Sequence, residues 1–195
     1  MRRHLKQLTR TPVSGAALVL GLMLLVLSFG DPSARRIGLT LIGAAIAAEE
    51  AAGMAAPIYG IKIPQGYRDW RMISAGNVGT PVNDVRVKLG NDIAIAAFRD
   101  DRHPFPDGTI IARLAYKQIT SKENNKALGH VQSFVAGPAT NLEFMVKDSK
   151  KYAATGGWGF AQFTNGKPDD ETVHKACFGC HALADRDFVF THYSP

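Results

Sequence analysis

The stretch Thr109-Ile-Ile-Ala-Arg-Leu-Ala-Tyr-Lys-Gln-Ile-Thr120 predicts a long β-strand in this chain. It is rich in Ile, Leu and Tyr, whose side chains suit a half-buried sheet surface. The turn sequence Phe105-Pro-Asp-Gly108 precedes it, and there proline presets one φ angle while glycine admits a positive one. Since successive side chains of a strand alternate between two faces, Arg113, Ala115 and Lys117 should share one face.

Further strands are expected on both sides of this stretch. Asp84 to Leu89 alternates polar and apolar residues, and Gly90-Asn91 ends the alternation. Apolar and aromatic runs predict more strands at residues 131–135, 142–147 and 158–163, with a helical turn at 148–152.

Helices are expected to be few. Asp92 is a candidate cap for a short helix through Phe98, although the Ile-Ala-Ile-Ala alternation leaves a strand possible. Asp169 or Asp170 should cap a helix that runs into the cysteines. The pattern predicts an α+β fold built mainly on an antiparallel sheet.

The stretch Lys175-Ala-Cys-Phe-Gly-Cys-His181 holds the only two cysteines of the chain and a histidine directly after the second. Three chemistries use cysteines this close: a redox dithiol, half of a zinc site, and thioether attachment of a haem with the next histidine as axial iron ligand. In haem attachment every residue has a task, because Cys177 and Cys180 bond to the vinyl groups and His181 binds the iron. The motif therefore favours one covalently bound haem c.

The two alternatives explain less of the sequence. A thioredoxin-type dithiol belongs to a βαβ unit, and nothing before Cys177 reads as one. A zinc site needs four ligands and would have to recruit His174 or His192, while an adjacent Cys-His pair suits tetrahedral angles poorly. Because His174, Cys177 and His181 share one face at helical spacing, His174 is also a candidate for a role at a haem.

Residues 1–56 predict an export signal or a membrane anchor with a tether. Four basic residues precede an apolar run from Val13 to Phe29, about 17 residues long, which is short for a membrane span. A second, weaker segment of basic and then apolar residues begins at Arg35-Arg36. The alternatives are therefore an anchor with a tether, or a translation start upstream of the real signal peptide. In either case the positive-inside rule places the domain of residues 57–195 in a bacterial periplasm.

The formal net charge of +6 does not indicate a nucleic-acid-binding protein. Residues 1–56 contribute three of these charges, and the domain shows no basic stripe with interleaved aromatic residues. Its length and apolar content suit one domain with a cofactor. Arg71, Arg86 and Lys117 are expected to be solvated strand residues more often than clamps for haem propionates.

An open or weakly held sixth iron position is expected. The methionines of the domain are Met72 and Met145, and both are explained as core residues. Phenylalanine is abundant in the domain, and a pocket lined by two or three phenylalanines would exclude water and favour small neutral ligands on iron.

A series of short motifs follows in this order: Gly-Tyr-Arg-Asp-Trp70, Leu-Gly-Asn-Asp-Ile-Ala94, Phe-Pro-Asp-Gly108, Phe-Met-Val-Lys-Asp-Ser-Lys-Lys-Tyr152, Gly-Gly-Trp-Gly-Phe-Ala-Gln-Phe163, Cys-Phe-Gly-Cys-His181 and Asp-Phe-Val-Phe-Thr191. From Gly66 to Pro195 the chain thereby resembles the cytochrome P-460 family, which includes the cytochromes c′-beta. The resemblance implies a mostly antiparallel β fold, a homodimer, and a covalent haem c with an empty or exchangeable sixth position. Members of that family oxidise hydroxylamine or bind small gases such as nitric oxide.

The resemblance also gives Arg113 a role. In hydroxylamine-oxidising members, a lysine on the strand after the Phe-Pro-x-Gly turn is joined covalently to the haem edge, and Arg113 stands at the matching position. A guanidinium remains protonated and is a poor nucleophile, while Lys117 lies two strand steps away, about 13 Å. We therefore expect an uncrosslinked haem, with Arg113 in the pocket pairing a propionate or polarising a ligand.

Three functions follow in order of preference. The first is binding of small nitrogen-oxide ligands such as nitric oxide, and the second is hydroxylamine oxidation, which a haem link through Lys117 or Lys88 would favour. The third is electron transfer to a redox partner protein.

Overall fold

The computed structural model describes residues 53–195. The chain divides into two compact units, Met1–Glu50 and Ala51–Pro195, and the export or anchor segment predicted at residues 1–56 lies almost wholly outside the described residues. Within the described part, no helix has the length and hydropathy needed to cross a membrane.

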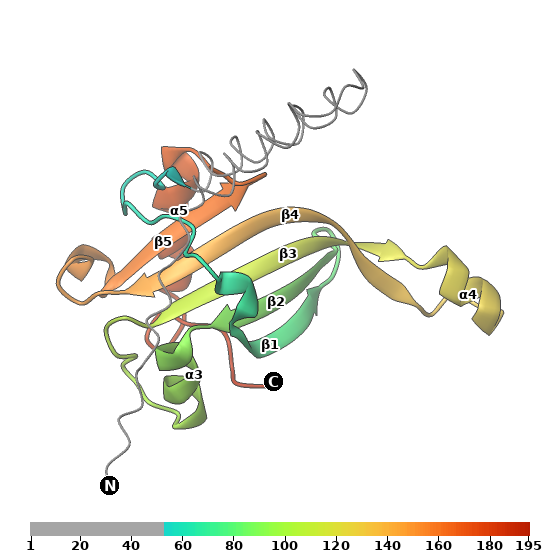
Figure 1. The fold of residues 1–195 in the computed structure, drawn as a ribbon, viewed down its shortest axis with the longest axis horizontal. Coiled ribbons are helices and arrows are strands. Elements are labelled where there is room, and N and C mark those ends of the chain that lie inside the picture. Colours follow the sequence, from blue (N-terminus) through green and yellow to red (C-terminus); the bar gives the residue numbers. More distant parts are fainter. Residues whose placement is uncertain (1–52) are drawn as a thin grey trace, which may run out of the picture. The chain divides into compact units, whose positions relative to one another are not determined.

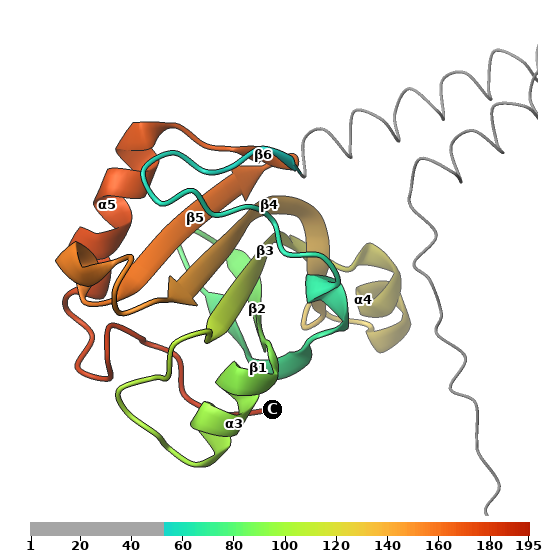
Figure 2. The ribbon, with the colours of Figure 1, turned by 60° about the vertical axis from the view of Figure 1, so that its left-hand side comes forward.

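The predicted α+β fold with a mainly antiparallel sheet is confirmed (Figure 1). Six antiparallel strands lie in chain order: β1 Arg71–Val78, β2 Asp84–Gly90, β3 Ile110–Thr120, β4 Phe134–Lys147, β5 Trp158–Thr164 and β6 Lys167–Pro168. The helices are α3 Asp92–Arg99, α4 Lys122–Leu128 and α5 Glu171–His181, with short 3-10 turns η1 Tyr67–Asp69 and η2 Ala153–Thr155. Figures 1 and 2 place α5 beside β5, and α3 beside the ends of β1 and β2.

Side-chain caps fix where the helices begin. Residues 92–99 form a helix and not a strand, and its cap is Asn91, whose side chain accepts hydrogen bonds from Ala94 N at 2.9 Å and Ile110 N at 3.1 Å. The prediction that Asp92 is the cap is therefore wrong. Asn91 has the extended backbone that a cap requires, whereas Asp92 is already helical. Asp170 caps α5 by accepting from Val173 N at 3.0 Å.

The two strands predicted at 131–135 and 142–147 are one strand, β4, which begins at Phe134. Pro138 interrupts the hydrogen-bonding pattern but not the strand, because the register shifts there: Tyr116 pairs with Ala139 and Gln118 with Ala136. Such a bulge accommodates a residue without an N–H. Strand β1 was not predicted, since its burial does not alternate.

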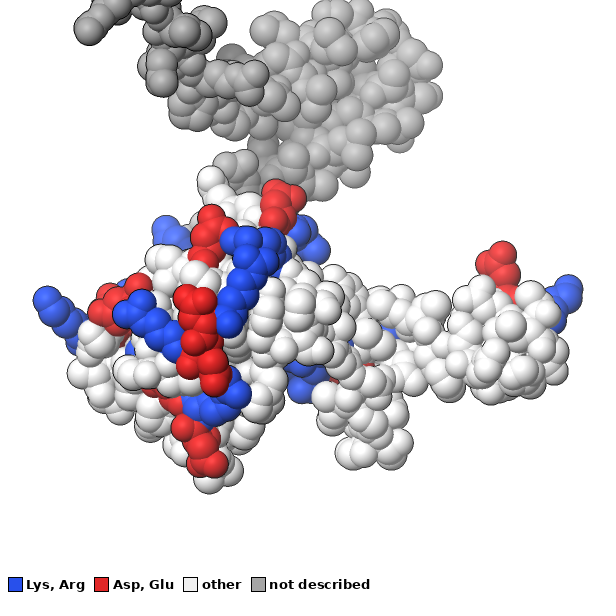
Figure 3. All heavy atoms as spheres, turned by 90° about the horizontal axis from the view of Figure 1, so that it is seen from below, with Lys and Arg blue, Asp and Glu red and all other residues white. Residues whose placement is uncertain are grey.

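An arm projects from the sheet where the ends of β3 and β4 carry α4 (Figure 1). At its tip the side chain of Asn125 accepts from the N–H groups of Gln132 and Ser133 and donates to Ser133 O. The arm exposes large apolar side chains: Ile119, Leu128, Val131, Phe134 and Val135. Figure 3 shows that charged side chains on the visible face of the arm gather at its tip.

Candidate functional site

A cavity of about 730 Å³ lies between one face of the sheet, α5 and the C-terminal segment. Strand pairing lays a row of polar residues across this face, in the order Ser74, Lys88, Arg113, Glu143 and Gln162. All but Gln162 line the cavity. Directly paired residues of antiparallel strands point to the same side of a sheet, so charges far apart in the sequence meet here.

Helix α5 brings both cysteines and the following histidine to the same cavity. The two thiols are free, Cys177 half-buried and Cys180 exposed. Burial raises the pKa of Cys177, whose Sγ donates to Val173 O at 3.4 Å. Because neither thiol is in a disulfide, both are available for covalent chemistry. The residues of the sequence motif thus lie at the cavity.

The ring of His181 is held in one tautomer. Its Nδ1 lies 2.8 Å from Phe188 O, and since a carbonyl only accepts, the proton resides on Nδ1 and Nε2 keeps a free lone pair. Burial is the main cause that lowers the pKa of His181, which favours the neutral imidazole that a metal requires. The rings of Phe160 and Phe190 flank it, with centroids at 5.0 and 5.6 Å.

His174 has a structural role and not one in the cavity. It is fully buried, its Nδ1 donates to Asp170 O at 2.7 Å, and its Nε2 accepts from Gln162 N at 3.1 Å. The Nε2 bond therefore joins α5 to β5, and the Nδ1 bond closes on the N-cap of α5 itself. With both ring nitrogens occupied, one proposed fourth ligand of a zinc site is removed. In the described part of the chain, no group of three or more His, Cys, Asp or Glu residues could hold a metal ion.

Arg113 lines the cavity but already has protein partners. It forms a bidentate ion pair with Glu143, in which Nε lies 2.6 Å from Oε2, and Nη2 donates to Asn141 at 3.2 Å. Burial, and next the nearby Arg86, lower the pKa of Arg113 to about 10, so it remains charged at neutral pH. Glu143 was not predicted, because only strand pairing places it opposite Arg113.

Two further cations face the cavity. Arg86 was expected to be solvated, but it is half-buried there, and among the described residues its Nε is one of the buried atoms without a hydrogen-bond partner. Burial, Arg86 and Arg113 together lower the pKa of Lys88. Lys117 lies elsewhere and donates to Val82 O at 2.8 Å. The alternation Val-Arg-Val-Lys in β2 could have predicted that these two cations share one face of the strand.

The rest of the lining is largely apolar. Phe160 and Phe190 contribute to it, as does Met145. Met145 pairs with Phe160 across β4 and β5 and also packs against the core. Met72 lies outside the cavity and is 40% exposed.

The residues present fit one haem. Two thiols and one imidazole nitrogen supply the donors, apolar rings supply walls for a macrocycle, and the cations Arg86 and Lys88 could balance two propionates.

A comparison with protein families agrees with this chemistry. The family model described as Cytochrome P460 matches residues 64–191, a range that spans all six strands and α5. No curated protein matches the chain.

Proposed function

Because this chain belongs to the cytochrome P460 family of haem proteins, we propose that it carries one covalent haem c and binds small nitrogen-oxide ligands such as nitric oxide. The observation that carries the proposal is the convergence of Cys177, Cys180 and the free Nε2 of His181 on one cavity. A bound haem would supply the iron on which such a ligand coordinates.

Each residue has a separate task in this proposal. Cys177 and Cys180 would hold the haem covalently through their thiols, and His181 Nε2 would bind its iron. Lys88 and Arg86 would balance the propionates, which need a cation when buried. Arg113, paired with Glu143, retains one unshared nitrogen, Nη1, that can polarise a ligand.

We infer that the sixth iron position is open or weakly held. Met145 pairs with Phe160, and the ring of Phe160 contacts that of His181, so Met145 would be a wall residue near His181 and not the sixth ligand. Phenylalanine rings around the cavity favour small neutral ligands over water.

Hydroxylamine oxidation is the second candidate because Glu143 puts a carboxylate in the cavity that could accept protons. Ligand binding is preferred because Arg113 holds both oxygens of that carboxylate. Electron transfer through a partner protein is the third candidate.

The test is to export the protein with the haem c maturation machinery and to measure peptide masses, spectra and turnover. We expect haem on the fragment with Cys177, binding of nitric oxide and carbon monoxide to the ferrous form, and little turnover of hydroxylamine with an artificial acceptor. An unmodified dithiol would overturn haem attachment, and a low-spin ferrous form that binds neither gas would overturn the open site.

The same masses test the absence of a crosslink. We expect no third attachment, since Arg113 stands at the position that the resemblance gives to the crosslinking lysine of the family. Lys88 is the lysine that lines the cavity. A third bond through Lys88, together with hydroxylamine turnover, would establish the enzyme instead.

We also propose that the protein is periplasmic and a homodimer, with the arm as the dimer contact. The arm exposes apolar residues next to a hydrogen-bonded tip. A second copy is the partner that the family resemblance implies. Val131→Asp should give a monomer in sedimentation experiments, whereas Leu183→Asp, at an exposed leucine outside the arm, should not. A monomeric wild-type protein would overturn the dimer.

A further inference from the structure

The carbonyl that orients His181 belongs to an unusual turn. Asp187 and Phe188 follow one another with φ angles of 49° and 66°, in the left-handed region that residues with a side chain rarely adopt. Phe188 O nevertheless lies 2.8 Å from His181 Nδ1. Something outside the turn must therefore hold it in place.

The carboxylate of Asp187 supplies that support. Its two oxygens lie 2.8 and 2.9 Å from Lys147 Nζ, and one of them also accepts from Phe105 N at 2.7 Å. The side chains of Lys147 and Asp187 are only 6% and 9% exposed. A buried ion pair of this kind fixes geometry, although its net contribution to stability is small.

Lys147 also contacts residues that lie outside the turn. Its Nζ donates to Gly156 O at 3.1 Å and lies 5.0 Å from the centre of the Trp158 ring. The Phe188 ring packs directly against Gly156, where a Cβ atom would approach the ring to 2.2 Å. The ammonium group of Lys147 thus binds both the turn residue Asp187 and the backbone of Gly156, against which Phe188 packs.

We propose that the Lys147–Asp187 pair is a positioning pair for the axial ligand: it holds the Phe188 carbonyl that sets the orientation and basicity of His181. The inference rests on the proposed haem c site. A hydrogen bond from the remote ring nitrogen makes a histidine more basic, and a more basic ligand stabilises ferric over ferrous iron.

The test uses the holoprotein and two readouts, the reduction potential and the iron–histidine stretching frequency of the ferrous form. Asp187→Asn and Lys147→Met should raise the potential and lower the frequency. We expect a shift in the ferric–ferrous equilibrium of about tenfold, or about 59 mV for one electron. Lys147→Arg keeps the charge and several donors and should return both readouts toward wild type.

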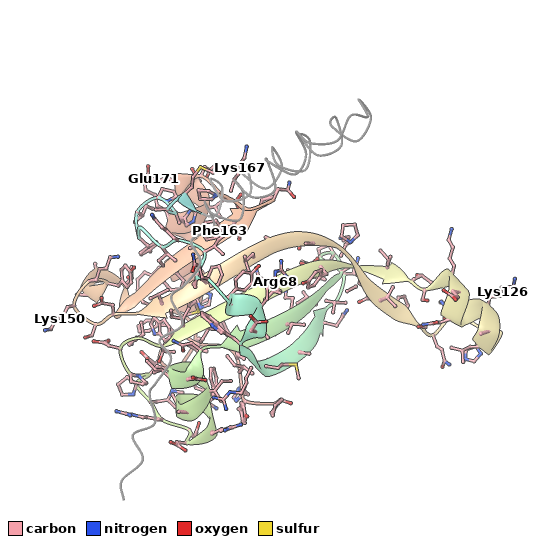
Figure 4. All side chains as sticks on the ribbon, in the orientation of Figure 1. Arg68, Lys126, Lys150, Phe163, Lys167 and Glu171 are labelled. Atoms are coloured by element: carbon pink, nitrogen blue, oxygen red, sulfur yellow. The ribbon has the colours of Figure 1, made fainter. Side chains whose placement is uncertain are left out.

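The matched control is the pair Glu171 and Lys175, which lies on the haem-motif helix but is 59% and 68% exposed. Glu171, labelled in Figure 4, is in the first turn of α5. Glu171→Gln and Lys175→Met should change neither readout.

The outcomes separate this proposal from the haem assignment. Wild-type protein without haem on Cys177 and Cys180 would defeat the proposed function. If haem is attached and Asp187→Asn matches wild type in both readouts, or the control variants shift them equally, the positioning role is wrong. Should Lys147→Met fail to accumulate, Asp187→Asn decides, because an amide keeps the volume and can still accept from Phe105 N.

Discussion

The two faces of the central sheet are made by the same strands and differ almost completely. One row across the sheet runs Leu89, Ala112, Phe144 and Ala161, all 8% exposed or less. The adjacent row on the opposite face runs Ser74, Lys88, Arg113 and Glu143. A shift of one residue therefore separates the hydrophobic core from the cavity.

The difference teaches how stability and chemistry are divided in this protein. Apolar burial on the first face stabilises the fold, whereas the second face holds desolvated charges, which are costly unless paired. Arg113 pairs with Glu143, and Arg86 lies 3.5 Å from Asp84, while Lys88 and Arg86 repel within the same cavity. The cavity face should therefore contribute little to the stability of the apoprotein.

The largest expected effect is the loss of covalent haem from a variant with Cys177→Ala and Cys180→Ala. The substitutions remove both thiols but leave the apolar face intact, so the chain should still fold. Haem staining of the denatured protein and its circular dichroism would measure the two properties. Ser74→Ala, also in the cavity, is the control and should retain haem; covalent haem on the double variant would contradict the assignment.

The next effect belongs to the apolar face. Phe163 (labelled in Figure 4) is 1% exposed and packs against Phe144 at 6.0 Å between ring centroids. Phe163→Ala should reduce the free energy of unfolding by about 3–5 kcal/mol, measured by urea denaturation, without changing the haem spectrum. Phe190→Ala, in the cavity and 57% exposed, should cost far less. Equal losses would abolish the contrast between the faces.

A smaller effect of opposite sign is expected for Lys88→Met in the apoprotein. Burial and two arginines lower the pKa of Lys88, so the folded state disfavours the charged form that the unfolded state keeps. At pH 7 the variant should be more stable, by at most about 1 kcal/mol. As the pH rises through the folded pKa toward the ordinary value, the wild-type residue loses its proton on folding and the difference should vanish.

The control for that experiment is Lys117→Met, on the same sheet but bonded to Val82 O outside the cavity. It should not raise the stability of the apoprotein. In the holoprotein the sign for Lys88→Met should reverse, because the charge then meets a propionate. Destabilisation of the apoprotein by Lys88→Met would show that the cavity charges are already balanced.

No spectral effect is expected for Met145→Leu. The swap conserves volume and should cost under about 1.5 kcal/mol, and the ferrous spectrum should not change if Met145 is a wall residue. Conversion from a six-coordinate to a five-coordinate spectrum would instead identify Met145 as the sixth ligand.

Local patterns predicted the elements that depend on neighbours in the sequence. The alternation from Asp84 to Leu89 and the turn before Ile110 correspond to observed strand boundaries within one residue. Of the two caps predicted for α5, Asp169 or Asp170, the structure has Asp170. Strand β1 and helix α4 were missed, because their exposed residues carry no clear period. The continuous strand β4 was divided in two, since Pro138 reads as a break unless the partner strand is known to shift register.

By itself the sequence determined the haem motif of Cys177, Cys180 and His181, since adjacent residues on one helix need no long-range information. Only the tertiary structure decided which charges join them. Strand pairing brings Glu143 to Arg113 and Lys88 to both, and chain reversal brings Asp187 to Lys147 and the Phe188 carbonyl to His181. The physical reason is that register and loop closure are fixed by the packing of the whole sheet, which no short segment of the chain encodes.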